Sequence, residues 1–245
     1  MTTLVIVAAL ATVACSEIGV ELVAGVDYSR GAYDLPRDTV VWSAPVSVLI
    51  DRGAWTVAVS GGYAVVDGPA TPGGAAFNPS ALTTRRRGLT DVTVDVWRTG
   101  RSRGGATWYS LGGGFTLPVG DAAKGLGVGD SDQFVHAEAG RDLDPYYLAG
   151  GVTYRFIHDS AWRDPVGAWA TAHRRVGERH ILGVGVDASQ RLGPGLSASQ
   201  GVSLYAGLGL DAGGELNLYY RAGVGPSAGD RALGFTIRKP LGGGR

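Results

Sequence analysis

The residues best suited to covalent chemistry are His158, Asp159 and Ser160, which follow one another directly. A histidine can act as general base toward a serine hydroxyl and turn it into a nucleophile. The segment 161–164 and Pro165, which come next, are equally typical of an ordinary loop. The chain carries no P-loop and no histidine-rich zinc motif. We therefore predict that the protein is not an enzyme, and we keep a hydrolase that uses His158 and Ser160 as an alternative.

A second group of possible ligands lies in and beside the glycine-rich segment 119–130. Asp121, Asp130 and Asp132 would offer carboxylate oxygens, which a hard cation such as Ca²⁺ prefers. The same composition is typical of a solvated acidic loop, and we favour that interpretation. We predict no metal and no cofactor.

The overall composition limits the classes of partner. The 22 basic and 22 acidic residues cancel and the pI is ≈ 6.9, so no global field indicates nucleic acid. Charged residues make up 18%, below the ~25% usual for soluble domains, whereas 41 residues are glycine. The lone Cys15 excludes a disulfide framework within the chain. The composition thus favours a chain with an apolar environment and many turns.

The elements that must position any site follow from a hydrophobic period of two. Apolar side chains alternate with polar side chains or glycine in residues 91–96, 182–187 and 201–208. Such alternation predicts strands with unlike faces. No segment keeps an apolar period of 3.6 residues for long, so we expect almost no helix beyond the apolar segment at residues 3–17.

Segments of this kind number about twelve. The predicted strands cover roughly residues 17–29, 39–51, 54–67, 88–98, 106–118, 131–142, 145–158, 165–176, 179–191, 199–210, 215–224 and 231–239. Their connections alternate between short and long. The short ones include residues 51–54 and 143–144, and the longest is GPATPGGAAFNPSALTTRRR, residues 68–87.

This alternation is typical of an outer-membrane barrel, which has an even number of strands, tight periplasmic turns and longer extracellular loops. A soluble β-sandwich or lipocalin-like barrel also alternates, but it would place charge on its outer face. Here one face of most segments is aliphatic or aromatic. We therefore predict an all-β fold: a single closed antiparallel transmembrane β-barrel of about 12 strands, with short periplasmic turns and longer extracellular loops.

If the aliphatic face of each strand meets lipid, the other face lines the lumen. The charged or histidine side chains on that face are predicted to form a polar constriction or a ligand site. The nine that we assign to this site are Asp91, Asp95, His136, Glu138, Arg155, His173, Arg175, Asp187 and Arg221, and Arg191 and Arg238 are predicted to face the lumen as well. The alternative is a network of paired charges that only stiffens a narrow barrel. The two interpretations can both hold.

The first residues read as an export signal. TLVIVAALATVACSE, residues 3–17, contains an apolar run of about a dozen residues, too short to span a bilayer as a helix. It resembles the apolar part of a signal peptide that ends near Ala14 or Cys15, although the usual basic residues before it are missing. Lipid attachment at Cys15 and a buried first strand are the alternatives. We predict a signal over residues 1–15 and the barrel over residues 16–245.

Four segments occur in the order found in one Gram-negative family. They are residues 45–69, 86–98, 117–132 (LPVGDAAKGLGVGDSD) and 149–191. Over roughly residues 40–210 the chain resembles the small outer-membrane proteins of the phenol-degradation meta-pathway transporter type. It departs from them at Thr90, where glycine is usual, and at Val119 and Val128, where threonine is usual. These motifs are structural, so the resemblance implies the fold more than any substrate.

The chain ends in GFTIRKPLGGGR, without the terminal aromatic residue that the outer-membrane assembly machinery usually reads. Either Phe235 takes that role, or the C-terminus is atypical or truncated. We nevertheless expect that machinery, outer-membrane lipids and a small-molecule solute to be the partners.

The expected function is that of an outer-membrane channel or uptake protein for small compounds, hydrophobic or aromatic ones among them. A structural barrel with a plugged lumen is the alternative, since twelve strands lie between the ~8 that side chains fill and the ~16–18 that leave a water channel. A third candidate is a lipid-acting hydrolase at the rim, because His158-Asp159-Ser160 resembles the His-x-Ser of outer-membrane lipid A deacylases.

Overall fold

The strands of this chain form one antiparallel sheet. The computed structural model describes residues 18–33, 37–71, 85–127, 129–156, 165–190, 198–211, 213–225 and 230–241. The predicted export signal and Cys15 lie outside these residues. The strands are β1 Gly19–Gly31, β2 Thr39–Arg52, β3 Trp55–Asp67, β4 Arg86–Leu89, β5 Val92–Arg101, β6 Thr107–Leu117, β7 Asp132–Leu143, β8 Tyr146–Phe156, β9 Val166–Val176, β10 His180–Ser189, β11 Ser199–Gly209, β12 Glu215–Val224 and β13 Arg231–Pro240.

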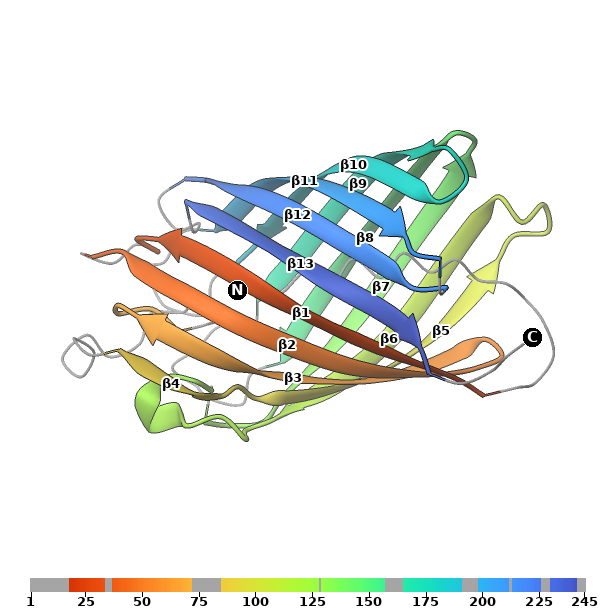
Figure 1. The fold of residues 1–245 in the computed structure, drawn as a ribbon. Coiled ribbons are helices and arrows are strands. Elements are labelled where there is room, and N and C mark those ends of the chain that lie inside the picture. Colours follow the sequence, from red (N-terminus) through yellow and green to blue (C-terminus); the bar gives the residue numbers. More distant parts are fainter. Residues whose placement is uncertain are drawn as a thin grey trace.

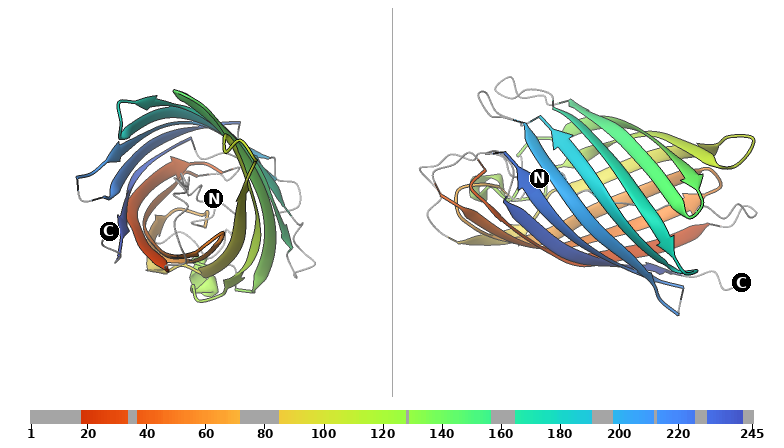
Figure 2. Two further views of the ribbon diagram at one scale, coloured as in Figure 1. Left: turned by 90° about the vertical axis from the view of Figure 1, so that its right-hand side faces the viewer. Right: turned by 90° about the horizontal axis from the view of Figure 1, so that it is seen from above.

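The sheet closes on itself into a barrel (Figures 1 and 2). Apart from β4 and β5, which do not pair with each other, each strand pairs with its neighbours in the chain, and β1 pairs with both β2 and β13, which completes the ring. Both β4 and β5 pair with β3, so they share one strand position in the ring, and the barrel wall has twelve strand positions. This confirms the predicted closed antiparallel barrel. Closure is required in lipid because an open edge would leave backbone donors and acceptors without partners.

The strand position that β4 and β5 share differs from the prediction. The sequence predicted one unbroken strand over residues 88–98, and the structure has two strands there. Ser60 of β3 is opposite Thr93, while Tyr63 is opposite Leu89, so two residues of β3 face the three residues 90–92. This is a β-bulge, in which one extra residue reverses the alternation of faces and bends the strand.

The two ends of the barrel differ. At one end, which we call the turn end, tight turns join β2 to β3, β5 to β6, β7 to β8, β9 to β10 and β11 to β12. Gly53 and Gly177 have positive φ values in two of these turns, a conformation that glycine adopts without strain. The first and last strands also begin and end there. The opposite end, the loop end, carries the longer connections, which agrees with the predicted alternation. Short turns at the periplasm and longer loops outside are the arrangement of outer-membrane barrels.

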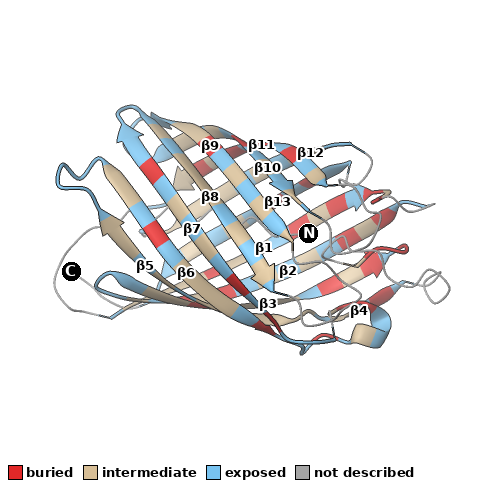
Figure 3. Ribbon diagram, turned by 180° about the vertical axis from the view of Figure 1, so that it is seen from behind, coloured by how far each residue is buried: buried red, intermediate tan, exposed pale blue. Residues whose placement is uncertain are grey.

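The two faces of the wall separate by polarity. On β10 the outward-facing Leu182, Val184 and Val186 are 50–55% exposed, and this outer alternation of exposed positions continues around the barrel (Figure 3). Apolar side chains this exposed are expected where lipid, not water, covers the surface. In the described part of the chain no helix is both long and apolar enough to cross a membrane, and the short 3-10 helix Ala122–Lys124 belongs to the loop end.

Apolar side chains also gather on the inner face. Val23, Leu49 and Ala58 form a buried cluster against which Trp97 packs. Towards the loop end, Leu126 of the loop between β6 and β7 packs against Val41, Ala64 and Val66 in a second buried cluster. The inner face is therefore polar only in part, and the loop is held by apolar contacts.

Candidate lumen site

The first charged group on the inner face joins Asp95, His136 and Glu138. Nε2 of His136 lies 3.1 Å from Oδ1 of Asp95, and its Nδ1 lies 4.0 Å from Oε1 of Glu138. Asp95 comes from β5 and both other residues come from β7, so the contact crosses β6. It does so over Gly112, where an added Cβ would lie 2.5 Å from Nε2 of His136. Only a glycine on β6 leaves room for the imidazole to reach the carboxylate.

The second group is an ion pair that crosses β11. Arg221 of β12 donates from Nε to Oδ1 of Asp187 at 2.9 Å and from its terminal nitrogen to Oδ2 at 2.7 Å. The guanidinium lies over Gly201 of β11, where an added Cβ would be 2.4 Å from it. Two parallel charge-assisted bonds of this kind fix both side chains against the wall.

Arg155 forms the third group, nearer the loop end. It donates to Oδ2 of Asp132 at 2.6 Å, and its guanidinium carbon lies 5.4 Å from the centroid of the Phe134 ring. Asp132 is buried, and the sequence suggested it only as a loop acid or cation ligand. Its contact with Arg155 makes it part of the inner wall.

His173 belongs to a row of aromatic side chains. Its ring stacks on Tyr147 with centroids 4.4 Å apart and planes 3° from parallel. Its Nδ1 is 2.6 Å from the hydroxyl of Tyr205, and the Tyr147 hydroxyl in turn accepts a hydrogen bond from Nε1 of Trp108. We call Trp108, Tyr147, His173 and Tyr205 the aromatic row. Its members come from β6, β8, β9 and β11, so the row covers much of one side of the barrel.

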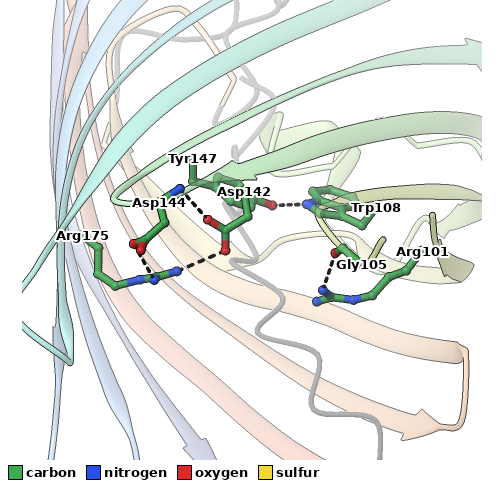
Figure 4. Close-up of polar contacts among 7 residues, drawn as sticks. All are labelled: Arg101, Gly105, Trp108, Asp142, Asp144, Tyr147 and Arg175. Carbon is green, nitrogen blue, oxygen red and sulfur yellow. Dashed lines mark hydrogen bonds and ion pairs between the residues drawn. The ribbon is translucent and has the colours of Figure 1, made fainter. Parts of the chain in front are cut away.

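Two predicted residues lie apart from these groups. Arg175 is at the turn end, where it donates to Asp142 and Asp144 at 3.3 Å each (Figure 4). Figure 4 also shows the Tyr147 hydroxyl facing Trp108 and the neighbouring contact of Arg101 with the carbonyl of Gly105. Arg175 is therefore a residue of the rim.

Asp91 occupies the β-bulge between β4 and β5, and its Oδ1 accepts a hydrogen bond from the backbone N–H of Gly120 at 2.9 Å. The bulge turns this carboxylate toward the loop that joins β6 to β7. Its contact holds the loop against the wall.

The remaining candidates of the sequence have the following places. Asp121 pairs with Lys124 at 2.7 Å, and nowhere in the described ranges do three or more His, Cys, Asp or Glu side chains gather closely enough to hold a metal ion. His158, Asp159 and Ser160 lie outside the described residues.

Sequence reasoning missed a polar contact at the junction where the barrel closes. Asp27 of β1 is buried, and its Oδ1 accepts a hydrogen bond from the Tyr219 hydroxyl of β12 at 2.5 Å. Nearer the turn end, Arg238 of β13 pairs with Glu21 of β1. The alternating pattern of β1 could have indicated Asp27 as an inward residue. Its partner is 192 residues away in the chain and becomes adjacent only when the ring closes.

No protein-family model matches the chain, and no curated protein does. Among solved structures, the chain is similar to an outer membrane channel from Pseudomonas putida F1, with 11% identity and a TM-score of 0.72 over 94% of this chain and 97% of that one. It is also similar to the translocator domain of the autotransporter NalP from Neisseria meningitidis, with 11% identity and a TM-score of 0.53 over 91% and 88% of the two chains. The beta domain of the Bordetella autotransporter BrkA gives 10% identity and a TM-score of 0.50 over 90% and 98%. This chain therefore has the fold of an outer-membrane β-barrel, which it shares with a bacterial channel.

Proposed function

We propose that this protein is an outer-membrane channel that takes up small, uncharged compounds, hydrophobic or aromatic ones among them. The observation that carries the proposal is the aromatic row on the inner face, beside charges that are already paired. The structural likeness to an outer membrane channel supports it, and so does the sequence resemblance to transporters of the meta-pathway type. An export signal over residues 1–15 would deliver the chain across the inner membrane.

The aromatic row offers flat apolar faces with polar edges. The ring of His173 lies parallel to that of Tyr147 and meets the ring of Tyr205 at an interplanar angle of 85°. Aromatic rings prefer such offset-stacked and edge-to-face arrangements, and each pair contributes roughly 0.5–1.5 kcal/mol beyond the area it buries. A solute ring that slides along this wall would meet the same kind of surface at each step.

The charges of the inner face disfavour a role as an ion channel. Asp187 is neutralised by Arg221, Asp132 by Arg155, and Asp95 contacts His136. Selective ion pores instead carry rings of charge of one sign. Paired charges keep the wall hydrated and orient the side chains while leaving little net field for an ion to follow.

Single-channel recording in planar bilayers tests this proposal. The purified protein should give a small conductance of weak ion selectivity, and added phenol should block it reversibly by occupying the aromatic row. Replacing His173 and Tyr147 together with alanine should weaken that block several-fold. Tyr146→Ala is the matched control, because Tyr146 lies on the outer face and is 53% exposed. A phenol block that is equally strong in all three proteins would contradict the assignment.

A structural barrel with a plugged lumen is the second candidate, and the two apolar clusters on the inner face favour it. Arg155→Gln, measured by conductance and by thermal unfolding, separates the two. In an open pore the change should shift the reversal potential towards cation selectivity. In either case the change should lower the thermal midpoint, because the buried Asp132 loses its partner, but in a plugged barrel no shift of a reversal potential accompanies it. Absence of conductance in the wild-type protein, together with that lower midpoint, would favour the structural barrel.

A further inference from the structure

The outer wall carries a depression where β9 runs between β8 and β10. The outward-facing residues of β9 here are Ala168, Ala170 and Ala172, which we call the alanine trough. Ala172 is flanked by Leu148 and Val184 in the register of the sheet. Ala170 lies beside Val186 and Gly150, and Ala168 lies beside Val152 and Ala188. Each alanine therefore has a larger, half-exposed side chain on at least one side, and only Ala172 has one on both, so the alanines form the floor of a groove with an interrupted edge.

Two grooves of about 710 and 620 Å³ mark this depression on the wall from β6 to β11. The first includes Tyr146, Ala172 and Arg174, and the second includes Arg141 and Ala170. Both volumes fall in the range of small-molecule sites, about 300–1,000 Å³. Most of the side chains that line them face outward, so these grooves open to whatever surrounds the barrel.

An arginine lies at the turn end of each groove. Arg174 and Arg141 are both exposed, and within the described residues neither has an acidic partner. Each guanidinium has five N–H donors and no acceptor, and its fork matches the oxygens of a phosphate. Tyr146 lies opposite Arg174 on β8 and faces outward as well. A tyrosine beside an unpaired arginine at the end of an apolar wall is typical of the level of lipid headgroups.

The length of the trough matches one leaflet. From Ala168 to Arg174 the strand advances six residues, about 20 Å at ~3.3 Å per residue. With the usual strand tilt of ~35–45°, this covers about 15 Å of depth, half of a hydrocarbon core of ~30 Å. An acyl chain that starts at Arg174 would therefore reach the middle of the bilayer at the end of the trough.

We propose that the alanine trough, with Arg174 and Arg141 at its mouth, binds one anionic phospholipid of the periplasmic leaflet. The phosphate would accept hydrogen bonds from the two guanidiniums, and one acyl chain would lie along the alanines. The charge of the mouth, the apolar groove and its depth all point to this occupant. The site is separate from the inner face, so it does not depend on whether the barrel conducts.

Native mass spectrometry of the folded barrel in a nonionic detergent, with phosphatidylglycerol added, tests the site. The wild-type protein should retain one lipid molecule. Arg174→Gln should weaken retention about five-fold, as expected for one basic side chain worth ~1 kcal/mol at a membrane surface. Ala170→Phe, which fills the trough, should weaken it several-fold, and Ala170→Leu serves as a milder change if that variant folds poorly. Unboiled gels verify folding of each variant.

Arg98→Gln is the matched control. Arg98 is exposed on the outer face of β5 near the turn end, but its neighbours Trp55 and Leu111 are large and it lines neither groove. Equal loss of lipid in this variant would mean unspecific attraction to cations and would overturn the site. Complete displacement of the lipid by excess inorganic phosphate would leave only an anion site. A change of oligomeric state in Ala170→Phe with lipid retention unchanged would assign the trough to a second copy of the chain instead.

Discussion

Replacement of Gly201 with alanine should break the Asp187–Arg221 ion pair without removing either charged residue. The guanidinium of Arg221 lies over Gly201, and an added Cβ would be 2.4 Å from its Cζ, Nε and one terminal nitrogen. No heavy atom can stay at that distance, so the guanidinium must move away from Gly201 and from its present position beside Asp187. The two hydrogen bonds to Asp187, at 2.9 and 2.7 Å, would then be lost.

The expected cost follows from how far the pair is buried. The side chains of Arg221 and Asp187 are 22% and 21% exposed. Exposed pairs contribute about 0–1 kcal/mol, and breaking fully buried ones costs about 3–5 kcal/mol, so we take about 2 kcal/mol for this pair. Alanine in a strand is better than glycine by roughly 0.5–1 kcal/mol, which offsets part of the loss. The net loss of unfolding free energy should therefore be about 1–1.5 kcal/mol.

Urea unfolding of the barrel in liposomes, followed by gel mobility, measures this loss. Asp187→Asn should be costly in the wild-type background and cost less than about 0.5 kcal/mol after Gly201→Ala, since the pair is already broken. Gly104→Ala is the control, because no atom lies within 4 Å of its added Cβ. If Asp187→Asn costs the same in both backgrounds, the ion pair across Gly201 does not exist and the reasoning fails.

Three further results are expected. Val94→Arg puts a cation on the outer face near the middle of the stretch from β4 to β5. It should lower the free energy of unfolding, measured in liposomes, by about 2–4 kcal/mol, whereas an unchanged stability would mean that the inner and outer faces are exchanged. Tyr219→Phe removes the hydroxyl that donates to the buried Asp27 and should cost about 1–3 kcal/mol in urea titrations, while Tyr220→Phe on the outer face should be neutral. The hydrogen bond from Lys124 holds the pKa of Asp121 below its ordinary value. The contact between the two residues should therefore be present above pH ~3.9 and be lost as the pH falls further. An NMR titration of the residue 124 amide should show this loss, and the Asp121→Asn variant should not show it.

The fold could be predicted from the sequence because one local rule decides it. Alternation in segments such as 182–187 separates an apolar face from a polar one, and short and long connections alternate along the chain. A strand with a wholly apolar outer face is stable only against lipid, and lipid permits only a closed sheet. Eleven of the twelve predicted strands therefore match single observed strands to within a few residues. The twelfth contains the bulge at residues 90–92, which reverses the alternation. The reversal could not be read from the sequence because Leu89 is the only apolar side chain of the short β4 before it.

The composition of the inner face was also within reach of the sequence, since the parity of each strand separates inward from outward residues. That parity identified Asp95, His136, Asp187 and Arg221 one by one. It could not say which of them meet. Partners on different strands are set by the register of the sheet and by which intervening residue lacks a side chain.

Only the tertiary structure decided those partners. Asp187 meets Arg221 because Gly201 leaves the space between them open, and Asp27 meets Tyr219 because the first strand closes against the last. Likewise, the alanine trough is a groove only because larger side chains of β8 and β10, such as Leu148 and Val184, stand beside it in the register of the sheet. A one-dimensional pattern records which face a residue occupies. Contacts across two strands depend on stagger and closure, which involve residues far apart in the chain.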